Sequence, residues 1–150
     1  MKTRIESDSM GELKVPEDAL YGAQTQRAIN NFPVSGKSMH EAFVRALLVA
    51  KSAAAQANTS LGLLSPNVGN AITEVVQELL QSPELMSHFP VDVYQTGSGT
   101  SSNMNANEVL ATLASSKTGE SVSANDHINY GQSSNDIIPT CIHISAAVEV

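Results

Sequence analysis

Two polar segments of the chain carry residue types that suit the binding of a small anion. The first runs Gly97-Ser98-Gly99-Thr100 and continues in a helical pattern to Val109. Its glycines allow the backbone to bend and to approach a ligand closely, and hydroxyl and N–H groups at a helix start can converge on an anion. No lysine follows the glycines, so the phosphate-loop pattern is absent. Taken alone, this segment equally fits a flexible loop and a helix cap.

The second polar segment extends from Asn125 to Asp136 and contains mostly amide, hydroxyl and carboxyl side chains. It lies immediately before an apolar stretch. Ser133 or Ser134 can cap a helix that begins there, and Asp136 suits its first turn. Capping needs one or two polar residues, however, and not a dozen. The surplus indicates a ligand site at the start of a helix.

The elements that must position these segments are expected to be mainly helical. Residues 4–15 fit two short extended pieces around a turn at Ser9-Met10-Gly11. A capping box, Ser38 to Glu41, predicts one helix start, and Ser65-Pro66 predicts a second. The second helix has one apolar stripe at helical spacing, formed by Val68, Ile72, Val75 and Leu79. Ser82-Pro83 repeats the start signal for a shorter helix that ends near Pro90.

The stretch from Ile137 to Val150 is apolar on nearly every side, which is typical of a helix inside a bundle. The sequence stops at Val150 without a cap or a polar tail. We therefore expect a fragment whose last helix continues in a longer protein. The predicted organisation is a mostly helical domain at 1–132, followed at 133–150 by the truncated start of a central helix bundle.

Composition excludes several classes of function. The net charge is −7 with eight Lys plus Arg, which opposes nucleic-acid binding. We find no apolar run long enough to span a membrane and no signal peptide. A single cysteine, Cys141, excludes an intramolecular disulfide and fits a reducing compartment, so a cytoplasmic location is expected. No residues have the spacing of metal ligands, and neither a metal nor a cofactor is expected.

Together the two segments resemble conserved regions of the fumarase/aspartase superfamily. The matching patterns are Gly-Ser-Gly-Thr-x-Ser-Asn-Met-Asn-x-Asn-Glu-Val, from Gly97, and Asn-Asp-His-x-Asn-x-x-Gln-Ser-Ser-Asn-Asp-x-x-Pro-Thr, from Asn125. The N-terminal part also fits, with Gly-Ala-Gln-Thr at residues 22–25. Gly-Ala-Gln-Thr and Gly-Ser-Gly-Thr resemble the class II, iron-independent fumarases more than aspartate ammonia-lyases.

The resemblance implies the N-terminal domain of the fumarase/aspartase fold, with a short β-hairpin that precedes the helices. It also implies a homotetramer around a long helix bundle, a cofactor-free reaction of the dicarboxylates fumarate and malate, and a place in the tricarboxylic acid cycle. Substrate would be bound by Ser98, Gly99 and Thr100 of one subunit and by Ser133, Ser134 and Asn135 of another. The family's catalytic serine and histidine have no counterpart in this chain, so the 150 residues alone are expected to be inactive.

Fumarases usually have His-Pro-Asn-Asp at a second, peripheral dicarboxylate site, where this chain has Ser123-Ala124-Asn125-Asp126. That site is therefore in doubt. The family pattern gives His127 a structural hydrogen bond rather than the role of a base. His143 is predicted to be a core or interface residue, and Cys141 is predicted to pack as a small hydrophobic side chain.

Other functions remain open from the sequence. Within the lyases, the alternative is an aspartate ammonia-lyase or a related superfamily enzyme. Outside them, a helical interaction domain could use the same scaffold without catalysis. A hydrolase built on Ser133 or Ser134 with His127 and Asp136 is also conceivable, although no nucleophile-elbow pattern supports it.

Overall fold

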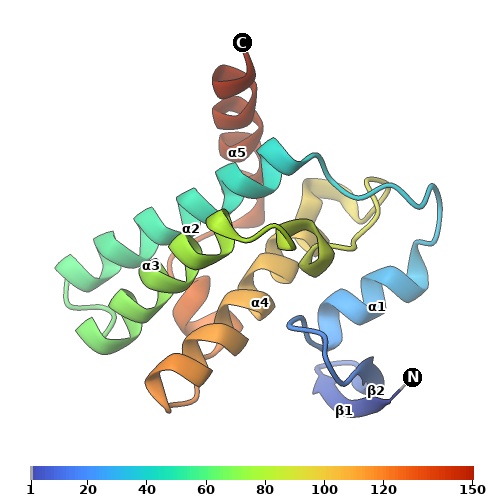
Figure 1. The fold of residues 1–150 in the computed structure, drawn as a ribbon, viewed down its shortest axis with the longest axis horizontal. Coiled ribbons are helices and arrows are strands. Elements are labelled where there is room, and N and C mark those ends of the chain that lie inside the picture. The colour runs from blue at the N-terminus through green and yellow to red at the C-terminus, as the bar shows by residue number, and fades with distance from the viewer. Residues whose placement is uncertain (1) are drawn as a thin grey trace.

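A computed structural model describes residues 2–150, which form a β-hairpin followed by helices (Figure 1). Strands β1 (Thr3–Asp8) and β2 (Gly11–Pro16) pair antiparallel, with Thr3 opposite Pro16 and Asp8 opposite Gly11. Gly11 has a φ of 113°, a backbone conformation that residues with a Cβ rarely adopt, so the tight turn depends on glycine there. The predicted extended pair is confirmed.

Five α-helices follow the hairpin: α1 (Ala23–Asn31), α2 (Glu41–Ser60), α3 (Pro66–Gln81), α4 (Thr100–Thr118) and α5 (Ser134–Glu149). Shorter turns join them, namely two 3-10 turns at Leu85–His88 and Gly97–Gly99 and a π-helical turn at Ala124–Ile128. The mainly helical fold class is confirmed.

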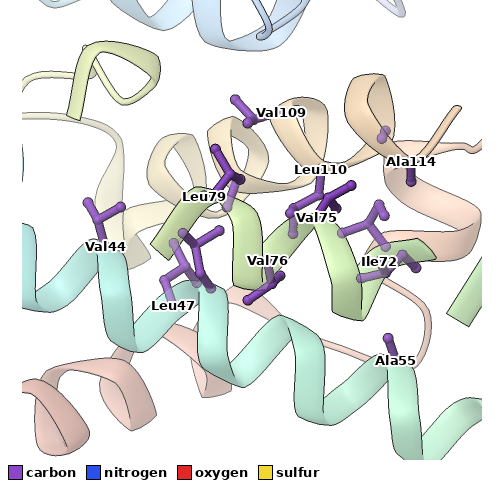
Figure 2. Close-up of a cluster of buried hydrophobic side chains, with 14 of the residues drawn as sticks. Val44, Leu47, Ala55, Ile72, Val75, Val76, Leu79, Val109, Leu110 and Ala114 are labelled. Atoms are coloured by element: carbon purple, nitrogen blue, oxygen red, sulfur yellow. The ribbon is translucent and has the colours of Figure 1, made fainter. Parts of the chain in front are cut away.

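The hydrophobic core lies between α2, α3 and α4, which pack against one another in Figure 2. The predicted stripe on α3 faces this core, and Val68, Ile72, Val75 and Leu79 are all buried. Leu47 from α2 and Leu110 from α4 meet the stripe from its two sides. Ser65 caps α3 by accepting a hydrogen bond from the N–H of Val68, as its position before a proline predicted.

Two predicted helix starts differ from the structure. The cap of α2 is His40, whose Nδ1 accepts from the N–H of Ala42, and the predicted capping box from Ser38 is wrong. Ser38 instead forms an isolated β-bridge with Asp92. Asp92 also accepts hydrogen bonds from the N–H groups of Ser35 and Gly36, and this loop stays non-helical until residue 40. After Ser82-Pro83 the chain forms only the 3-10 turn Leu85–His88.

The hairpin and α1 are fastened to the helical core by charged side chains. The Arg27 guanidinium on α1 donates to both carboxylate oxygens of Asp8 at 2.9 and 2.7 Å. The Glu108 carboxylate on α4 accepts from the N–H groups of Gly22, Gln24 and Thr25 and from the Thr25 hydroxyl. A carboxylate from a distant helix thus serves as the cap of α1.

Helix α5 begins at the core and then projects away from the other helices toward the C-terminus (Figure 1). Ser133 caps it by accepting from the N–H of Asn135, and Asp136 lies in its first turn. It packs against α2. The proposed division at residues 132 and 133 thus coincides with a helix start and remains a prediction. Among residues 2–150, no helix combines the length and apolar character needed to cross a bilayer.

Candidate functional site

The first polar segment forms a tight turn that leads directly into α4. Ser98 and Gly99 both have a φ of 65°, in the left-handed region. Ser98 is the only residue other than glycine with a positive φ in the described part of the chain, and such strained positions often occur at functional sites. Glycine is required at position 99 for two reasons: the left-handed φ, and a Cβ there that would lie 3.0 Å from Cγ2 of Ile138 on α5.

Helix α4 starts at Gly99, which has no side chain to cap it, so N–H groups of its first turn lack partners within the helix. Ser98 and Thr100 are exposed beside them. Gln95 holds this turn from the other side: its Oε1 accepts from the N–H of Ser102, and its Nε2 donates to the Ser102 hydroxyl, both at 2.9 Å. The turn is therefore fixed by buried contacts, and its hydroxyl groups remain free to contact a ligand.

Buried asparagines continue the polar character of this segment into the helix. Asn103, Asn105 and Asn107 are each at most 1% exposed. Asn105 donates to the backbone oxygen of His88. Asn103 and Asn107 both donate to Oδ1 of Asn129, at 3.1 and 3.2 Å. Their role is structural, since they connect α4 to the turn that precedes α5.

The second polar segment meets the first at the start of α5. The Asn103 side chain donates to the Ser134 hydroxyl at 3.2 Å, while Ile138, one turn later, packs against Gly99. Ser133 and Asn135 are exposed, and Ser134 is half-buried. The N-terminal ends of α4 and α5 are thereby brought together.

This arrangement suits an anionic ligand. Each helix N-terminus carries a partial positive charge, and hydroxyl and N–H donors surround the point where the two ends meet. The resemblance implied that the two segments serve a site from different subunits. In this chain the two segments lie next to each other. How subunits of an assembly would share them stays a prediction.

A cleft of about 220 Å³ opens beside Thr100. Its lining residues include Thr96, Met104, Asp8 and Arg27. The hydrogen bonds with Arg27 lower the pKa of Asp8, and the same pair raises the pKa of Arg27. Both groups are therefore charged at neutral pH and compensate each other, which leaves the helix N-termini to attract an anion.

The sequence analysis missed Lys51, which lies behind the junction of the two segments. It is the largest fully buried side chain of the described residues, and its Nζ donates to Asn129 at 3.0 Å and to Gln132 at 2.8 Å. Burial lowers the pKa of Lys51 to about 7, against a smaller opposing influence of Cys141. The available signal was a lysine among the small and apolar residues of α2.

The remaining candidates are placed as follows. His127 accepts a hydrogen bond from the Ser123 N–H through Nδ1, as predicted, and this bond gives it no link to Ser133 or Ser134. His143 is exposed, so within this chain it is not a core residue. Cys141 is buried as predicted, and burial raises its pKa to about 11.

At the peripheral stretch, the Ser123 hydroxyl donates to the Asp126 carboxylate and accepts from its N–H. Ala124 begins the π-helical turn, and Asn125 is exposed. Two members of the stretch are thus engaged with each other. Residues 2–150 contain no group of three His, Cys, Asp or Glu side chains that could hold a metal ion.

Comparison with known proteins identifies the family. A family model described as lyase matches residues 11–150. The chain belongs to this lyase family. Fumarate hydratase class II 2 of Pseudomonas aeruginosa is 69% identical over 148 residues, covering 99% of this chain and 32% of that protein. Fumarate hydratase class II of Xylella fastidiosa strain 9a5c is 57% identical over 147 residues, covering 98% and 31%.

Solved structures give the same result. A class II fumarase from Schistosoma mansoni has a TM-score of 0.92 and 40% identity, covering 99% of this chain and 32% of that one. A fumarate lyase:delta crystallin from Brucella melitensis in native form has a TM-score of 0.91 and 41% identity, covering 98% and 36%. The predicted resemblance and the lyase class are confirmed. The chain spans about a third of the length of the curated relatives it matches.

Proposed function

We propose that this lyase chain is the N-terminal part of a class II fumarate hydratase, which catalyses the reversible hydration of fumarate to L-malate in the tricarboxylic acid cycle. The proposal depends chiefly on one observation. The two segments that carry the family resemblance converge at two helix N-termini, where Asn103 donates a hydrogen bond to Ser134 and Gly99 packs on Ile138. The high identity to fumarate hydratases of two bacteria supports the choice of substrate.

In this proposal the chain supplies groups that hold the substrate. Ser98, Gly99 and Thr100 at the start of α4 contact the dicarboxylate, and Ser133, Ser134 and Asn135 contact it from the start of α5. When a base removes the C3 proton of malate, negative charge accumulates on the neighbouring carboxylate. Neutral donors fixed in advance around that position stabilise the developing charge. The acid–base pair is contributed by chain segments outside these 150 residues.

The complete enzyme is proposed to be a cytoplasmic homotetramer built around a helix bundle. The aliphatic side chains on the outer part of α5 support this assembly, because Ile142, Ile144 and Val148 are between 36% and 76% exposed. Together with Ala42, Ala46 and Val49 of α2, this part of α5 forms a mostly apolar groove that a neighbouring helix would fill. No cofactor is assigned.

The decisive experiment is an assay of the full-length protein that contains this chain, with fumarate, L-malate and L-aspartate as substrates. Interconversion of fumarate and malate without loss of aspartate is the expected result. Turnover of aspartate to fumarate would replace the proposal by an ammonia-lyase, and no turnover of all three would favour a helical interaction domain. The 150-residue chain, assayed alone at the same concentration, is expected to leave fumarate unchanged.

A further inference from the structure

Lys51 is unusual because its charge is buried without an acidic partner. It is 0% exposed, and none of the salt bridges formed by residues 2–150 includes it. Its two hydrogen-bond acceptors are the neutral amide oxygens of Asn129 and Gln132. Burying an ammonium group is costly, and an apolar side chain of similar volume often serves packing equally well. A lysine at this place therefore indicates a need for its donors.

The acceptor shared by these contacts is Oδ1 of Asn129. It receives Nζ of Lys51 from α2 and the amide groups of Asn103 and Asn107 from α4, at 3.0, 3.1 and 3.2 Å. The Asn129 amide group in turn donates to the backbone oxygen of Gln132 at 3.2 Å. One side-chain oxygen thus joins two helices to the turn at residues 129–132.

This turn leads directly to the residues proposed to hold the substrate. Gln132 is fixed at both ends of its side chain: Oε1 accepts from Lys51, and Nε2 donates to the Ile128 backbone oxygen at 2.9 Å. Ser133 follows at once as the cap of α5. Asn103, which shares the Asn129 acceptor with Lys51, also donates to Ser134.

We propose that Lys51 is a positioning residue: it fixes the Asn129–Gln132 turn, and through it Ser133–Asn135, against the first turn of α4. The inference depends on the proposed function for its kinetic consequence but not for its structural one. A side-chain amide can rotate by half a turn and exchange its oxygen for its nitrogen. An ammonium group bonds only to an oxygen, so protonated Lys51 reinforces the orientation that the backbone oxygens of Gln132 and Ile128 already favour at Asn129 and Gln132.

The test compares Lys51→Met with wild type in the full-length protein. Methionine keeps the length of the side chain and removes its donors. Lys117→Met is the matched control, because Lys117 lies at the far end of α4 and pairs with Glu74 and Glu78 on α3. The measurements are KM and kcat for fumarate, the oligomeric state, and amide hydrogen exchange along residues 2–150.

Lys51→Met is expected to raise KM about tenfold with kcat changed by less than about twofold. Displacement of Ser133–Asn135 would weaken the binding of the ground state and of the transition state alike. Amide exchange should become about tenfold faster at residues 129–136 and stay unchanged in α3. Lys117→Met should leave KM, kcat and the exchange of residues 129–136 as in wild type. A variant that lost folded protein alone would lower the apparent kcat at constant KM.

Unchanged exchange at residues 129–136 in Lys51→Met would overturn the positioning role, and so would a fall in apparent kcat at constant KM. A wild-type protein without fumarate turnover would instead contradict the proposed function. In that case the exchange data still decide on Lys51. Faster exchange confined to residues 129–136 supports its positioning role, and exchange equal to wild type rejects it.

Discussion

Helices α3 and α5 each contain 16 residues, and each follows a serine that caps it through its side chain. They differ in how the rest of the chain covers them. Helix α3 buries residues along its whole length, from Val68 to Leu79. Helix α5 buries only Ile137, Ile138 and Cys141, all in its first half. Beyond Cys141 its aliphatic side chains face outward, and Val148 is 76% exposed.

The difference shows which parts of each helix this chain specifies by itself. The stripe of α3 is matched by α2 and α4, so its position is determined within the 150 residues (Figure 2). Only the first half of α5 is matched in this way, at the end where the two polar segments meet. Its projecting half (Figure 1) has an apolar surface that residues 2–150 cover only in part. That half agrees with the proposed helix bundle of the complete enzyme.

The largest effect is expected from shortening a side chain on the covered helix. Ile72 is 0% exposed, so Ile72→Ala should lower the free energy of unfolding by about 2–5 kcal/mol through lost burial and a cavity. Ile142, 50% exposed on α5, is the matched control, and Ile142→Ala should change the same quantity by less than about 0.5 kcal/mol. Urea denaturation of the 150-residue chain measures both. Equal losses would mean that α5 is covered as fully as α3.

The next effect concerns the end of α5 that is covered. Thr100 is exposed at the junction with the first turn of α5, and the proposal gives its hydroxyl a hydrogen bond to the substrate carboxylate. Losing one hydrogen bond to a charged group costs about 1.5–3 kcal/mol. Thr100→Val in the full-length protein should therefore lower kcat/KM for fumarate about ten- to a hundredfold while the assembly stays intact.

Ser116→Ala, an exposed position near the other end of α4, is the control for this substitution and should leave kcat/KM unchanged. Steady-state kinetics and size-exclusion chromatography give the two readouts. Wild-type kinetics in Thr100→Val would remove Thr100 from the site.

Features that depend on neighbouring residues were predictable from the sequence. The cap and proline at Ser65-Pro66, the stripe on α3, the cap at Ser133 and the hairpin turn at Gly11 are each encoded within a few positions. Even the hydrogen bond of His127, which the family pattern implied, is made to a residue four positions away.

Features that depend on distant residues were not predictable in the same way. The box at Ser38 failed because Asp92, more than fifty residues later, pairs with Ser38 and accepts a hydrogen bond from the loop before it. The contact between Asn103 and Ser134 spans 31 positions and has no local signature. Lys51 reaches its acceptors across 78 and 81 positions, so its place among small and apolar residues of α2 marked it as unusual without indicating its partners.

A glycine substitution tests how closely α5 is fitted to the rest of the chain at its start. A Cβ at Gly99 would lie 3.0 Å from Ile138, and the φ of 65° is itself unfavourable for alanine. Gly99→Ala should therefore lower the free energy of unfolding by about 1–3 kcal/mol. Gly97→Ala is the control, because a Cβ there meets nothing within 4 Å, and it should cost less than about 1 kcal/mol. If both variants unfold at the same urea concentration, α5 is not in tight contact with the turn before α4.

A dependence of stability on pH is also expected, and it arises behind the start of α5. Burial lowers the pKa of Lys51 from its ordinary 10.5 to about 7 in the folded chain. Between those values the unfolded chain binds a proton that the folded chain does not, so the free energy of unfolding rises with pH. The slope is at most about 1.4 kcal/mol per pH unit. Below pH 7 this contribution is constant, and the buried charge destabilises the fold.

The pH range in which Lys51 can be tested ends near pH 9. Burial raises the pKa of Cys141 from 9.0 to about 11, so above pH 9 Cys141 makes the free energy of unfolding fall with pH. Urea denaturation at pH 6, 7, 8 and 9 should therefore show wild type gaining stability relative to Lys51→Met between pH 7 and 9. Taking the difference between the two proteins cancels the contribution of all other groups that titrate alike in both. Parallel curves across this range would mean that Lys51 keeps its ordinary pKa. Water would then reach the Lys51 ammonium group behind the start of α5.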